Sequence, residues 1–255
     1  MVNGIADFTG RRVLVIGASS GIGKQTAIRL AELGADVILL ARREEKLKEV
    51  LASLGEGNHS YYVADLNELD SIGTVFRQIQ SEQGKLDGMV YSAGISLSVP
   101  LNLFTPEKLQ KIFNINFFAF VECVRHACKK GRFNDGMRIV GVSSAASMRG
   151  DKSHLGYSAS KAAMDSAVRC IATEVAGKGI CINTVAPAMT ATEMLAAYLQ
   201  KNDKDSQSNQ GLFARQYLGI AKTTDIADAI AFLLSPSARF ITGITLPVDG
   251  GMTTS

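Results

Sequence analysis

Short runs of apolar residues alternate along the chain with longer segments in which apolar residues recur at helical spacing. The short runs are rich in β-branched residues and predict strands at 12–17, 36–41, 60–65, 87–94, 138–144, 180–187 and 245–251. The longer segments predict helices at 23–34, 44–54, 68–84, 105–130, 157–177 and 223–235. Strands that are apolar on both faces need helices on both sides, which is typical of a parallel sheet.

This alternation predicts an α/β protein: a single-domain, Rossmann-type, doubly wound parallel sheet of about seven strands with helices on both faces. No shift in composition divides the chain, so one domain should span residues 1–255. The polar stretch 201–211 follows the sixth strand, where a lid over the carboxyl edge of the sheet could lie. We expect a substrate loop at about 190–215; the alternative is an inert, solvent-exposed turn.

Composition narrows the possible partners. The chain is 46% hydrophobic and 20% charged, with a net charge of only +3 and no long run of Lys or Arg. Such a balance gives little electrostatic attraction to nucleic acid. No window reaches the roughly 18 apolar residues of a membrane span, and the first residues, MVNGIADFTGRR, lack the apolar core of a signal peptide. We therefore expect a cytoplasmic protein with no nucleic-acid and no membrane partner.

The cysteines give no sign of a metal site or of a disulfide framework. Cys123, Cys128, Cys170 and Cys181 form no CxxC pair, and the three histidines are scattered. Because the neighbours of the cysteines are apolar, we expect buried free thiols in a reducing compartment and no bound metal.

A glycine-rich turn, Gly17-x-x-x-Gly21-x-Gly23, follows the first predicted strand directly and opens a helix. The first glycine lets the chain turn sharply, the second lets the backbone approach a pyrophosphate, and the third permits close packing of helix on strand. The helix N-terminus supplies N–H groups for the phosphate. The alternative is a turn without a ligand. The expected cofactor contacts of this turn are Gly17, Ser19, Ser20, Gly21, Ile22 and Gly23.

The end of the second strand favours NADP(H) over NAD(H). Sites for NAD place an acidic residue there for the ribose hydroxyl, but this chain has Ala41 followed by Arg42 and Arg43. Arginine can hold a 2′-phosphate in a bidentate manner, and Ser19 could donate to the same group. The alternative is that both arginines begin a solvated helix face.

The end of the third strand adds two candidate cofactor contacts, Asp65 and Leu66. Asp65 is placed to accept from the adenine amino group. Alternatively, it is only a cap for the helix that follows.

The stretch YSASK places Tyr157 and Lys161 four residues apart, on one face of a helix. Ser144, thirteen residues before the tyrosine, ends the fifth strand at the same carboxyl edge of the sheet. An ammonium favours the phenolate, and lowering a tyrosine pKa from ~10 towards ~7 needs about 4 kcal/mol, which close charges in a partly dry cleft can supply. The small residues of 158–160 would keep the approach open. We interpret the pair as a proton-transfer site; the alternative is a stray aromatic and lysine on a surface helix.

Together the glycine turn, the serine and YxxxK resemble the short-chain dehydrogenase/reductase family over residues 17–251. The resemblance implies that Tyr157 is the general acid for carbonyl reduction and that Lys161 lowers its pKa and binds the nicotinamide ribose. It also implies that Ser144 hydrogen-bonds the substrate oxygen. Asn116 matches the asparagine that holds a proton-relay water in the family, although it could be only an amide that stabilises a kink.

Some positions depart from the family pattern. The residues after the sixth strand are Pro187-Ala188 rather than Pro-Gly, and the resemblance gives the role of binding the nicotinamide carboxamide to Thr192. After the fourth strand the family has Asn-Ala-Gly, whereas this chain has Ser92, Ala93 and Gly94, which we still expect beside the cofactor. None of these departures touches the proton-transfer residues.

The C-terminal stretch FITGITLPVDGG resembles that of 3-oxoacyl-(acyl carrier protein) reductases and their relatives, which implies a homotetramer or homodimer. Those reductases dock an acidic carrier with two basic residues. Here one position is Lys178 but the other is Asp135, so a carrier-bound substrate is not implied.

We therefore predict an NADP(H)-dependent oxidoreductase that transfers hydride between nicotinamide and a small-molecule ketone or secondary alcohol. An enoyl reductase is disfavoured because related enoyl reductases space Tyr and Lys more widely. The other alternative is a dinucleotide-binding sensor or scaffold, for which a proton donor has no use. The expected substrate contacts, apolar apart from the serine and alternatively ordinary core, are Ser144, Ala146, Met148, Met189, Met194 and Leu195.

Overall fold

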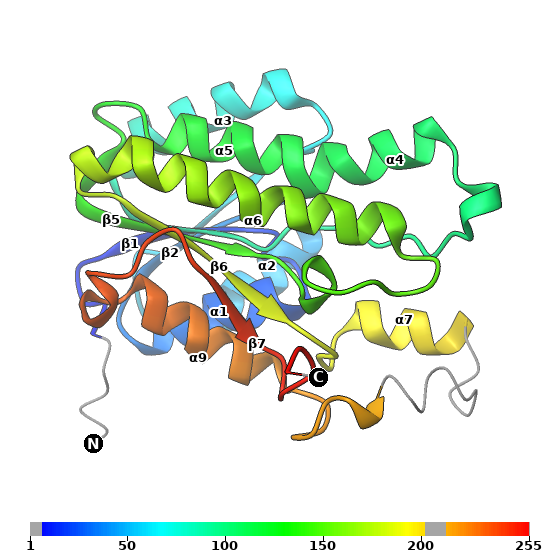
Figure 1. The fold of residues 1–255 in the computed structure, drawn as a ribbon. Coiled ribbons are helices and arrows are strands. Elements are labelled where there is room, and N and C mark those ends of the chain that lie inside the picture. The colour runs from blue at the N-terminus through cyan, green and yellow to red at the C-terminus, as the bar shows by residue number, and fades with distance from the viewer. Residues whose placement is uncertain (1–6, 202–212, 255) are drawn as a thin grey trace.

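A single sheet of parallel strands runs through the molecule in the order β3-β2-β1-β4-β5-β6-β7 (Figure 1). The computed structural model describes residues 7–201 and 213–254. The order reverses between β1 and β4, which creates a crevice at the carboxyl ends of these two strands. The strands are β1 (Arg12–Ile16), β2 (Asp36–Ala41), β3 (Ser60–Val63), β4 (Leu86–Tyr91), β5 (Phe133–Val142), β6 (Cys181–Pro187) and β7 (Thr245–Val248).

Helices cover both faces of this sheet, as Figure 1 shows, and the predicted fold class is confirmed. One layer contains α3 (Leu69–Gln83), α4 (Pro106–Phe113), α5 (Ala119–Ala127) and α6 (Leu155–Val175). The opposite layer contains α1 (Gly21–Glu32), α2 (Glu44–Ala52) and α9 (Thr223–Leu234), while α7 (Glu193–Lys201) lies beside the amino-terminal end of α6. Within the described residues, no helix is long and apolar enough to cross a membrane.

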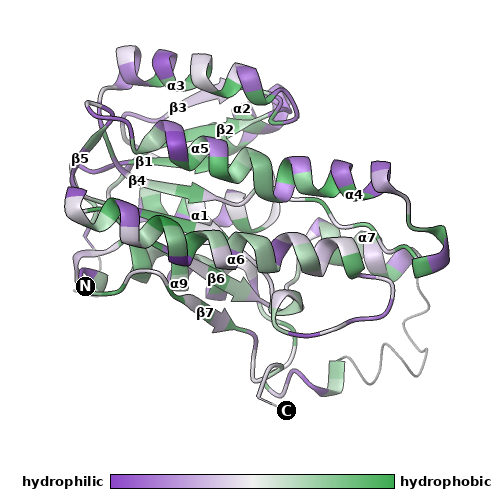
Figure 2. Cartoon of the chain, turned by 45° about the horizontal axis from the view of Figure 1, so that its top comes forward, coloured by the Kyte–Doolittle hydropathy of each residue, from purple (hydrophilic) through white to green (hydrophobic). Residues whose placement is uncertain are grey.

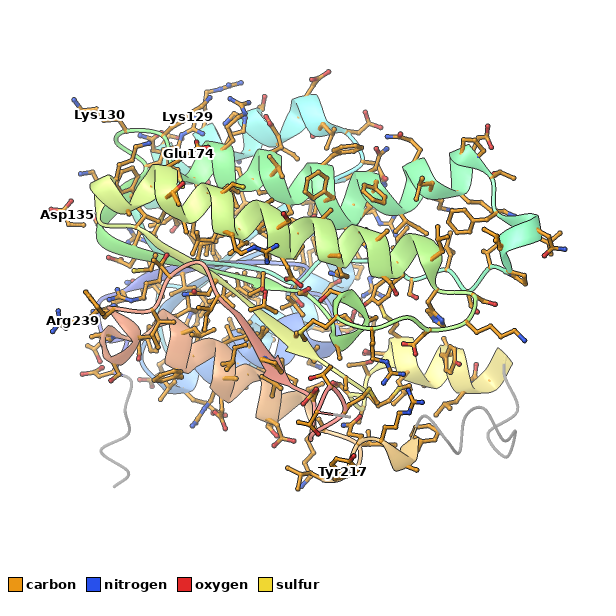
Figure 3. The ribbon with its side chains drawn as sticks, viewed as in Figure 1. Lys129, Lys130, Asp135, Glu174, Tyr217 and Arg239 are labelled. Carbon is orange, nitrogen blue, oxygen red and sulfur yellow. The ribbon has the colours of Figure 1, made fainter. Side chains whose placement is uncertain are left out.

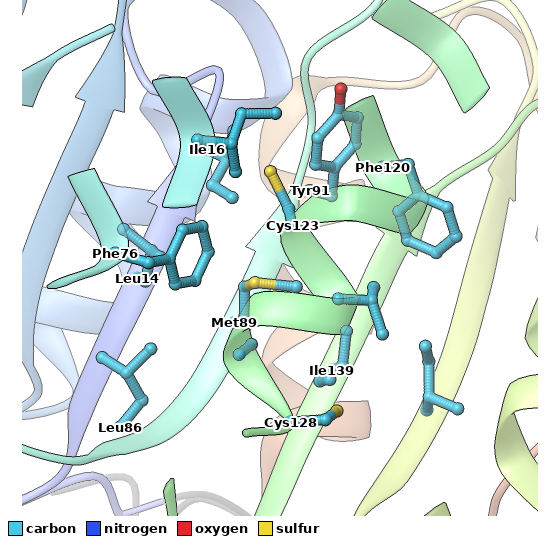
Figure 4. Packing of buried hydrophobic residues seen from close by; sticks show 14 of the residues in the cluster. Leu14, Ile16, Phe76, Leu86, Met89, Tyr91, Phe120, Cys123, Cys128 and Ile139 are labelled. Atoms are coloured by element: carbon cyan, nitrogen blue, oxygen red, sulfur yellow. The ribbon is translucent and has the colours of Figure 1, made fainter. Parts of the chain in front are cut away.

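The core is divided by the sheet into two apolar layers. Leu14 and Ile16 of β1 face one layer, which includes Phe120 and Cys123 of α5 (Figure 4). The alternate residues of the same strand, including Val15, face the other layer. Burial on both faces explains why the central strands are nearly continuous apolar runs, and β1 and β2 are largely green in the hydropathy colouring of Figure 2.

The predicted helix 105–130 is one helical run with a change of pitch in its middle. Thr105 caps it by accepting from the Lys108 N–H at 3.5 Å, and Pro106 occupies its first turn, as predicted. Residues Asn114–Phe118 form a π-helical turn, η2, between α4 and α5. A single π turn inserted in an α-helix is frequent at functional sites.

Most strand ends differ from the prediction by one to three residues; β3 ends at Val63 and β5 at Val142, so Asp65 and Ser144 lie just beyond their strands. β5 begins at Phe133 instead of 138: Phe133 pairs with Leu86, and the pairing resumes at Arg138, beyond Gly136 with its φ of 76°. The register between β4 and β5 shifts at the same place, between Leu86 and Gly88. β4 ends at Tyr91, so residues 92–94 belong to the loop that follows.

The prediction of four buried thiols is wrong for Cys170. Cys123 and Cys128 are buried and Cys181 is partly buried, but Cys170 is exposed on α6. Val168 and Ala172 of that helix face the core, and the residue between them therefore points away from it. In the described parts of the chain, no group of three or more His, Cys, Asp or Glu residues could hold a metal ion.

Candidate active site

The glycine turn packs tightly against the chain that follows β4. Gly17 has φ of 82°, and a Cβ placed there would lie 2.5 Å from the backbone nitrogen of Ala93. A Cβ on Gly23 would lie 2.3 Å from the carbonyl oxygen of Gly17, so only glycine allows the start of α1 to approach the turn. The predicted roles of these two glycines, a sharp turn and close helix packing, are confirmed.

The N-terminus of α1 opens into the crevice at this turn. Ser20 is the N-cap residue, and among the described residues its side chain makes no capping hydrogen bond. The first turn of α1 also contains no acidic residue. The N–H groups of this turn, together with the helix dipole, are suited to a phosphate.

Arg43, rather than Arg42, reaches the glycine turn. Its Nη2 lies 2.9 Å from Ser19 Oγ and 2.8 Å from Ser20 Oγ, and its Nε lies 3.3 Å from Ser19 Oγ. Arg42 is exposed on the neighbouring position. One guanidinium and two hydroxyls thus form a polar cluster at the end of β2, the place predicted for a ribose 2′-phosphate.

Asp65 has local partners in the structure. Its carboxylate accepts from the Asn67 backbone N–H at 3.0 Å and from Asn67 Nδ2 at 2.9 Å. This contact forms the turn that leads from β3 towards α3. Leu66 beside it is buried. The adenine contact of Asp65 stays a prediction.

The π turn places Asn116 in a buried hydrogen-bond network. Asn116 Oδ1 accepts from the Ile95 N–H at 2.9 Å, and Nδ2 donates to the Ile95 carbonyl at 3.0 Å and to Ser160 Oγ at 2.9 Å. Ser160 Oγ in turn donates to the carbonyl of Tyr157 at 2.8 Å. The amide therefore links three segments: the loop after β4, the π turn and the start of α6.

The prediction that the small residues 158–160 only keep the approach to Tyr157 open is wrong for Ser160. It is fully buried and bonded, whereas Ala159 is exposed on the other side of α6. The sequence offered one signal for this role, a hydroxyl beside the YxxxK lysine, but a small polar residue in a helix has many uses.

Lys161 lies at the centre of the site and is 3% exposed. Its Nζ donates to the carbonyl of Val142, at the end of β5, at 2.7 Å. A Cβ on Gly94 would lie 3.4 Å from both Lys161 Nζ and Asn116 Oδ1. Because Gly94 has no side chain, the space beside the ammonium and the amide is kept free.

Tyr157 and Ser144 complete the cluster. Lys161 Nζ is 5.9 Å from the centroid of the Tyr157 ring. Ser144 Oγ accepts from the Ala146 N–H at 3.2 Å, which starts the short 3₁₀ turn η3 (Ala145–Ser147), and the Ser144 hydroxyl is close enough to the Tyr157 phenol to lower its pKa. The serine, tyrosine, lysine and asparagine predicted from widely separated motifs thus lie together at the carboxyl edge of the sheet.

The pKa of Tyr157 is shifted in the direction opposite to the one predicted. Packing of protein atoms around the phenol raises its pKa above the usual 10, and the nearby Ser144 hydroxyl opposes the rise only in part. Burial also lowers the pKa of Lys161 to about 8, against the charge of Asp165, which raises it. Desolvation dominates both groups, and sequence spacing cannot reveal its size.

Thr192 lies over the glycine turn. Its methyl group would be 3.4 Å from a Cβ on Gly21, and its Oγ1 accepts from the Leu195 N–H at 3.3 Å at the start of α7. A hollow of about 560 Å³ runs along α7, and Thr192 and Leu195 line it. Pro187, which ends β6, is buried. The structure thus brings the predicted carboxamide-binding residue next to the predicted phosphate cradle.

The remaining predicted substrate contacts are only partly described. Met194 is 47% exposed on α7, Met148 is 45% exposed, and Ala146 and Met189 are partly buried. The polar stretch 201–211 falls outside the described residues, apart from Lys201 at the end of α7.

Gln216 is a buried residue that the sequence did not reveal. It is 4% exposed, its Oε1 accepts from the Met189 N–H at 2.9 Å, and its Nε2 donates to the Met189 carbonyl at 3.0 Å. Beside it, the backbones of Thr190 and Ala221 pair as an isolated β-bridge. The amide therefore fixes the chain between β6 and Thr192. A single glutamine in a polar stretch carries no pattern that predicts this.

Comparison with known proteins agrees with this arrangement. Residues 17–253 match a family model described as enoyl-(acyl carrier protein) reductase. A glucose 1-dehydrogenase of Gluconobacter oxydans is 33% identical over 250 residues, which cover 96% of this chain and 93% of the relative. A 3-oxoacyl-(acyl-carrier-protein) reductase of Rickettsia bellii is 33% identical over 246 residues, which cover 96% of this chain and 98% of the relative. The crystal structure of a short chain dehydrogenase from Burkholderia cenocepacia in complex with NADP superposes with a TM-score of 0.87, at 30% identity, over 96% of this chain and 98% of that one.

Replacement of Gln216 should test whether its two hydrogen bonds to the Met189 backbone, here called the Gln216 clamp, stabilise the fold. Gln216→Ala leaves the N–H and C=O of Met189 without their partner, which should lower the free energy of unfolding by about 2 kcal/mol. Gln216→Glu keeps an acceptor but removes the donor and adds a buried charge, so it should not restore stability. Urea denaturation measures both variants. Gln78→Ala, at an exposed glutamine of α3, is the matched control, and equal midpoints for Gln216→Ala and wild type would contradict the clamp.

Proposed function

The chain belongs to the short-chain dehydrogenase/reductase family, and on that basis we propose that it is an NADP(H)-dependent oxidoreductase that interconverts a ketone and a secondary alcohol. The observation that carries the proposal is the cluster of Ser144, Tyr157 and Lys161 beside the side-chain-free space at Gly94. These groups can hold a carbonyl oxygen and transfer a proton to it.

The residues of this chain fit a nicotinamide dinucleotide. The glycine turn and the uncapped start of α1 would hold the pyrophosphate, Arg43 with Ser19 and Ser20 would hold the 2′-phosphate, and Lys161 would bind the nicotinamide ribose at Gly94. When bound, the cofactor supplies or accepts the hydride; the side chains below handle orientation and the proton.

Tyr157 is the proton donor in ketone reduction. Because burial raises its pKa, the phenol is protonated near neutral pH and can donate to the carbonyl oxygen. The hydroxyl of Ser144 donates a hydrogen bond to the same oxygen as negative charge develops on it. The Lys161 ammonium, charged below pH 8 or so, stabilises the phenolate that remains.

Asn116 holds this pair in place through the backbone. Its amide binds Ser160, whose hydroxyl binds the Tyr157 carbonyl, so the first turn of α6 cannot move away from the π turn without breaking buried hydrogen bonds. This is the support that a preorganised site needs. The relay water of the family stays a prediction for this chain, as does the assembly into a homotetramer or homodimer.

The alternatives have weaker support. A dinucleotide-binding sensor would not need the Tyr157 phenol next to the Ser144 hydroxyl and the Lys161 ammonium. The family model that matches is described as an enoyl reductase, but Tyr157 and Lys161 share one face of α6 at the four-residue spacing, whereas enoyl reductases space this pair more widely. Relatives are named after glucose, L-xylulose and a 3α-hydroxysteroid, so they leave the substrate open.

Replacement of Tyr157 should remove catalysis and leave binding intact. Tyr157→Phe deletes only the hydroxyl, so kcat/KM for ketone reduction should fall by about 10²- to 10⁴-fold. The Kd for NADPH, measured by fluorescence titration, should change little. Tyr217→Phe, at an exposed tyrosine that Figure 3 labels, is the control. If the wild type binds NADPH tightly but turns over no ketone or alcohol, and Tyr157→Phe behaves identically, the chain is a sensor.

The substitution Arg43→Ala should weaken the preference for NADP(H) over NAD(H). Loss of a charge-assisted contact to the 2′-phosphate costs about 1.5–3 kcal/mol, which is roughly a 10- to 100-fold rise in Kd for NADPH. The Kd for NADH should stay nearly constant, because NADH lacks that phosphate. Arg42→Ala is the matched control. An equal loss of affinity for both cofactors, or a larger effect of Arg42→Ala, would refute the role of Arg43.

A further inference from the structure

The imidazole of His154 lies between two tyrosine rings, one of them that of Tyr157. Its centroid is 6.5 Å from that of Tyr157, with an interplanar angle of 73°, and 5.9 Å from that of Tyr198, with an angle of 49°. Edge-to-face and tilted contacts at these separations are favourable for aromatic rings. One ring thus connects the proposed proton donor on α6 with α7, which lies beside the start of α6 in Figure 1.

Backbone contacts on both sides hold His154 in this position. Ser153 before it has a left-handed φ of 65°, and its carbonyl accepts from the Val99 N–H at 2.8 Å. The His154 N–H donates to the Asp151 carbonyl at 3.2 Å, and His154 Nδ1 is 3.1 Å from the Lys152 carbonyl. Because a carbonyl only accepts, Nδ1 carries the proton and the ring is fixed in orientation. A strained turn that is held by its surroundings is typical of a binding site.

Large apolar side chains are exposed on the same two segments. Leu155, next to the histidine, is 48% exposed, and Met148 in the preceding turn is 45% exposed. On α7, Met194 is 47% exposed and precedes Tyr198 by four residues, so the two share one face of the helix. Exposed apolar groups next to a cleft with convergent polar groups indicate a surface for an apolar ligand.

The charged side chains of residues 149–152 do not favour an anionic ligand. Arg149 pairs with Asp151 through Nε at 3.1 Å and through Nη2. The remaining Nη1 of Arg149 has no hydrogen-bond partner among the described residues but is buried, so this guanidinium offers no unpaired N–H group at the surface. Lys152 is exposed to solvent, where an ammonium stays hydrated.

We propose that His154 and Tyr198 form an aromatic wall of the substrate site that selects ketones carrying an apolar ring next to the carbonyl group. This inference rests on the proposed function, in which the carbonyl oxygen reaches Tyr157 and Ser144. The substrate ring packs against the wall, and Met194 adapts to its shape. A polyhydroxy ketone would lose hydrogen bonds to water on this surface without replacement.

The reaction that this site serves is balanced by the cofactor and the tyrosine. The carbonyl carbon gains a hydride from NADPH and the carbonyl oxygen gains the proton of Tyr157. The products are the secondary alcohol and NADP⁺, and water returns a proton to the phenolate. His154 and Tyr198 bind the substrate and take no part in the proton transfer.

Initial rates of the full chain with NADPH and matched ketones test the proposal. We expect kcat/KM for acetophenone and cyclohexyl methyl ketone to exceed that for dihydroxyacetone by about tenfold or more, with butanone between them. Tyr198→Ala and His154→Ala should each raise KM for acetophenone by about three- to tenfold, the size of one lost aromatic contact. Tyr198→Phe, which keeps the ring, should retain the wild-type KM. Phe240→Ala, at an aromatic residue that is 95% exposed elsewhere on the chain, should leave the ratio of rates unchanged.

The outcomes separate this inference from the proposed function. If dihydroxyacetone is reduced as well as acetophenone, or if Tyr198→Ala leaves their ratio unchanged, the aromatic wall is refuted while the oxidoreductase stands. If His154→Ala unfolds, Tyr198→Ala and Tyr198→Phe still decide the matter, because Tyr198 lies on a partly exposed helix. If the wild type reduces none of these ketones, the aromatic wall is refuted; the proposed function fails only if no other ketone or alcohol is turned over and Tyr157→Phe changes nothing.

Discussion

The ammonium of Lys161 is the group around which the site is built. It is nearly excluded from solvent, and a buried charge is costly unless polar groups surround it. The end of β5 supplies the carbonyl of Val142, and Asp165 supplies a negative charge one helical turn further along α6. Even so, burial lowers the lysine pKa to about 8. A chain selected only for stability would place an apolar side chain here, so the charge is best explained by what it does to its neighbours, the Tyr157 phenol and the space at Gly94.

The candidate site also depends on the π-helical turn η2 (Asn114–Phe118). The phenol of Tyr91, fully buried at the end of β4, donates to the Ile115 carbonyl at 2.5 Å. That carbonyl would be part of an ordinary helical ladder if α4 and α5 were continuous. The π turn directs the Asn116 side chain inward, where it bonds Ile95 and Ser160. One irregular turn of helix therefore joins the loop after β4 to the segment that holds Tyr157.

The sequence was sufficient to predict the sheet and the order of its elements, because apolar runs are local signals, and its short motifs with the family resemblance led to the four residues of the candidate site. The remaining features depend on contacts between distant segments. Whether Arg42 or Arg43 reaches Ser19 depends on the direction in which each leaves β2. The clamp of Gln216 on Met189 spans 27 residues, and Ser160 acquires its role only from the π turn. The direction of the Tyr157 shift depends on desolvation, which no spacing encodes.

The pKa of Lys161 in the folded chain is the most direct test of this account. Nitrogen-15 NMR of labelled lysine, with the Lys161 resonance assigned by comparison with Lys161→Met, gives the titration of this ammonium. The account predicts a midpoint near pH 8, well below the 10.5 of an unperturbed lysine. Because the folded pKa lies below the unfolded one, the free energy of unfolding should also rise with pH between these two values, relative to Lys161→Met. A midpoint at 10.5 or higher would show that the ammonium is solvated, and would contradict the buried charge on which the site depends.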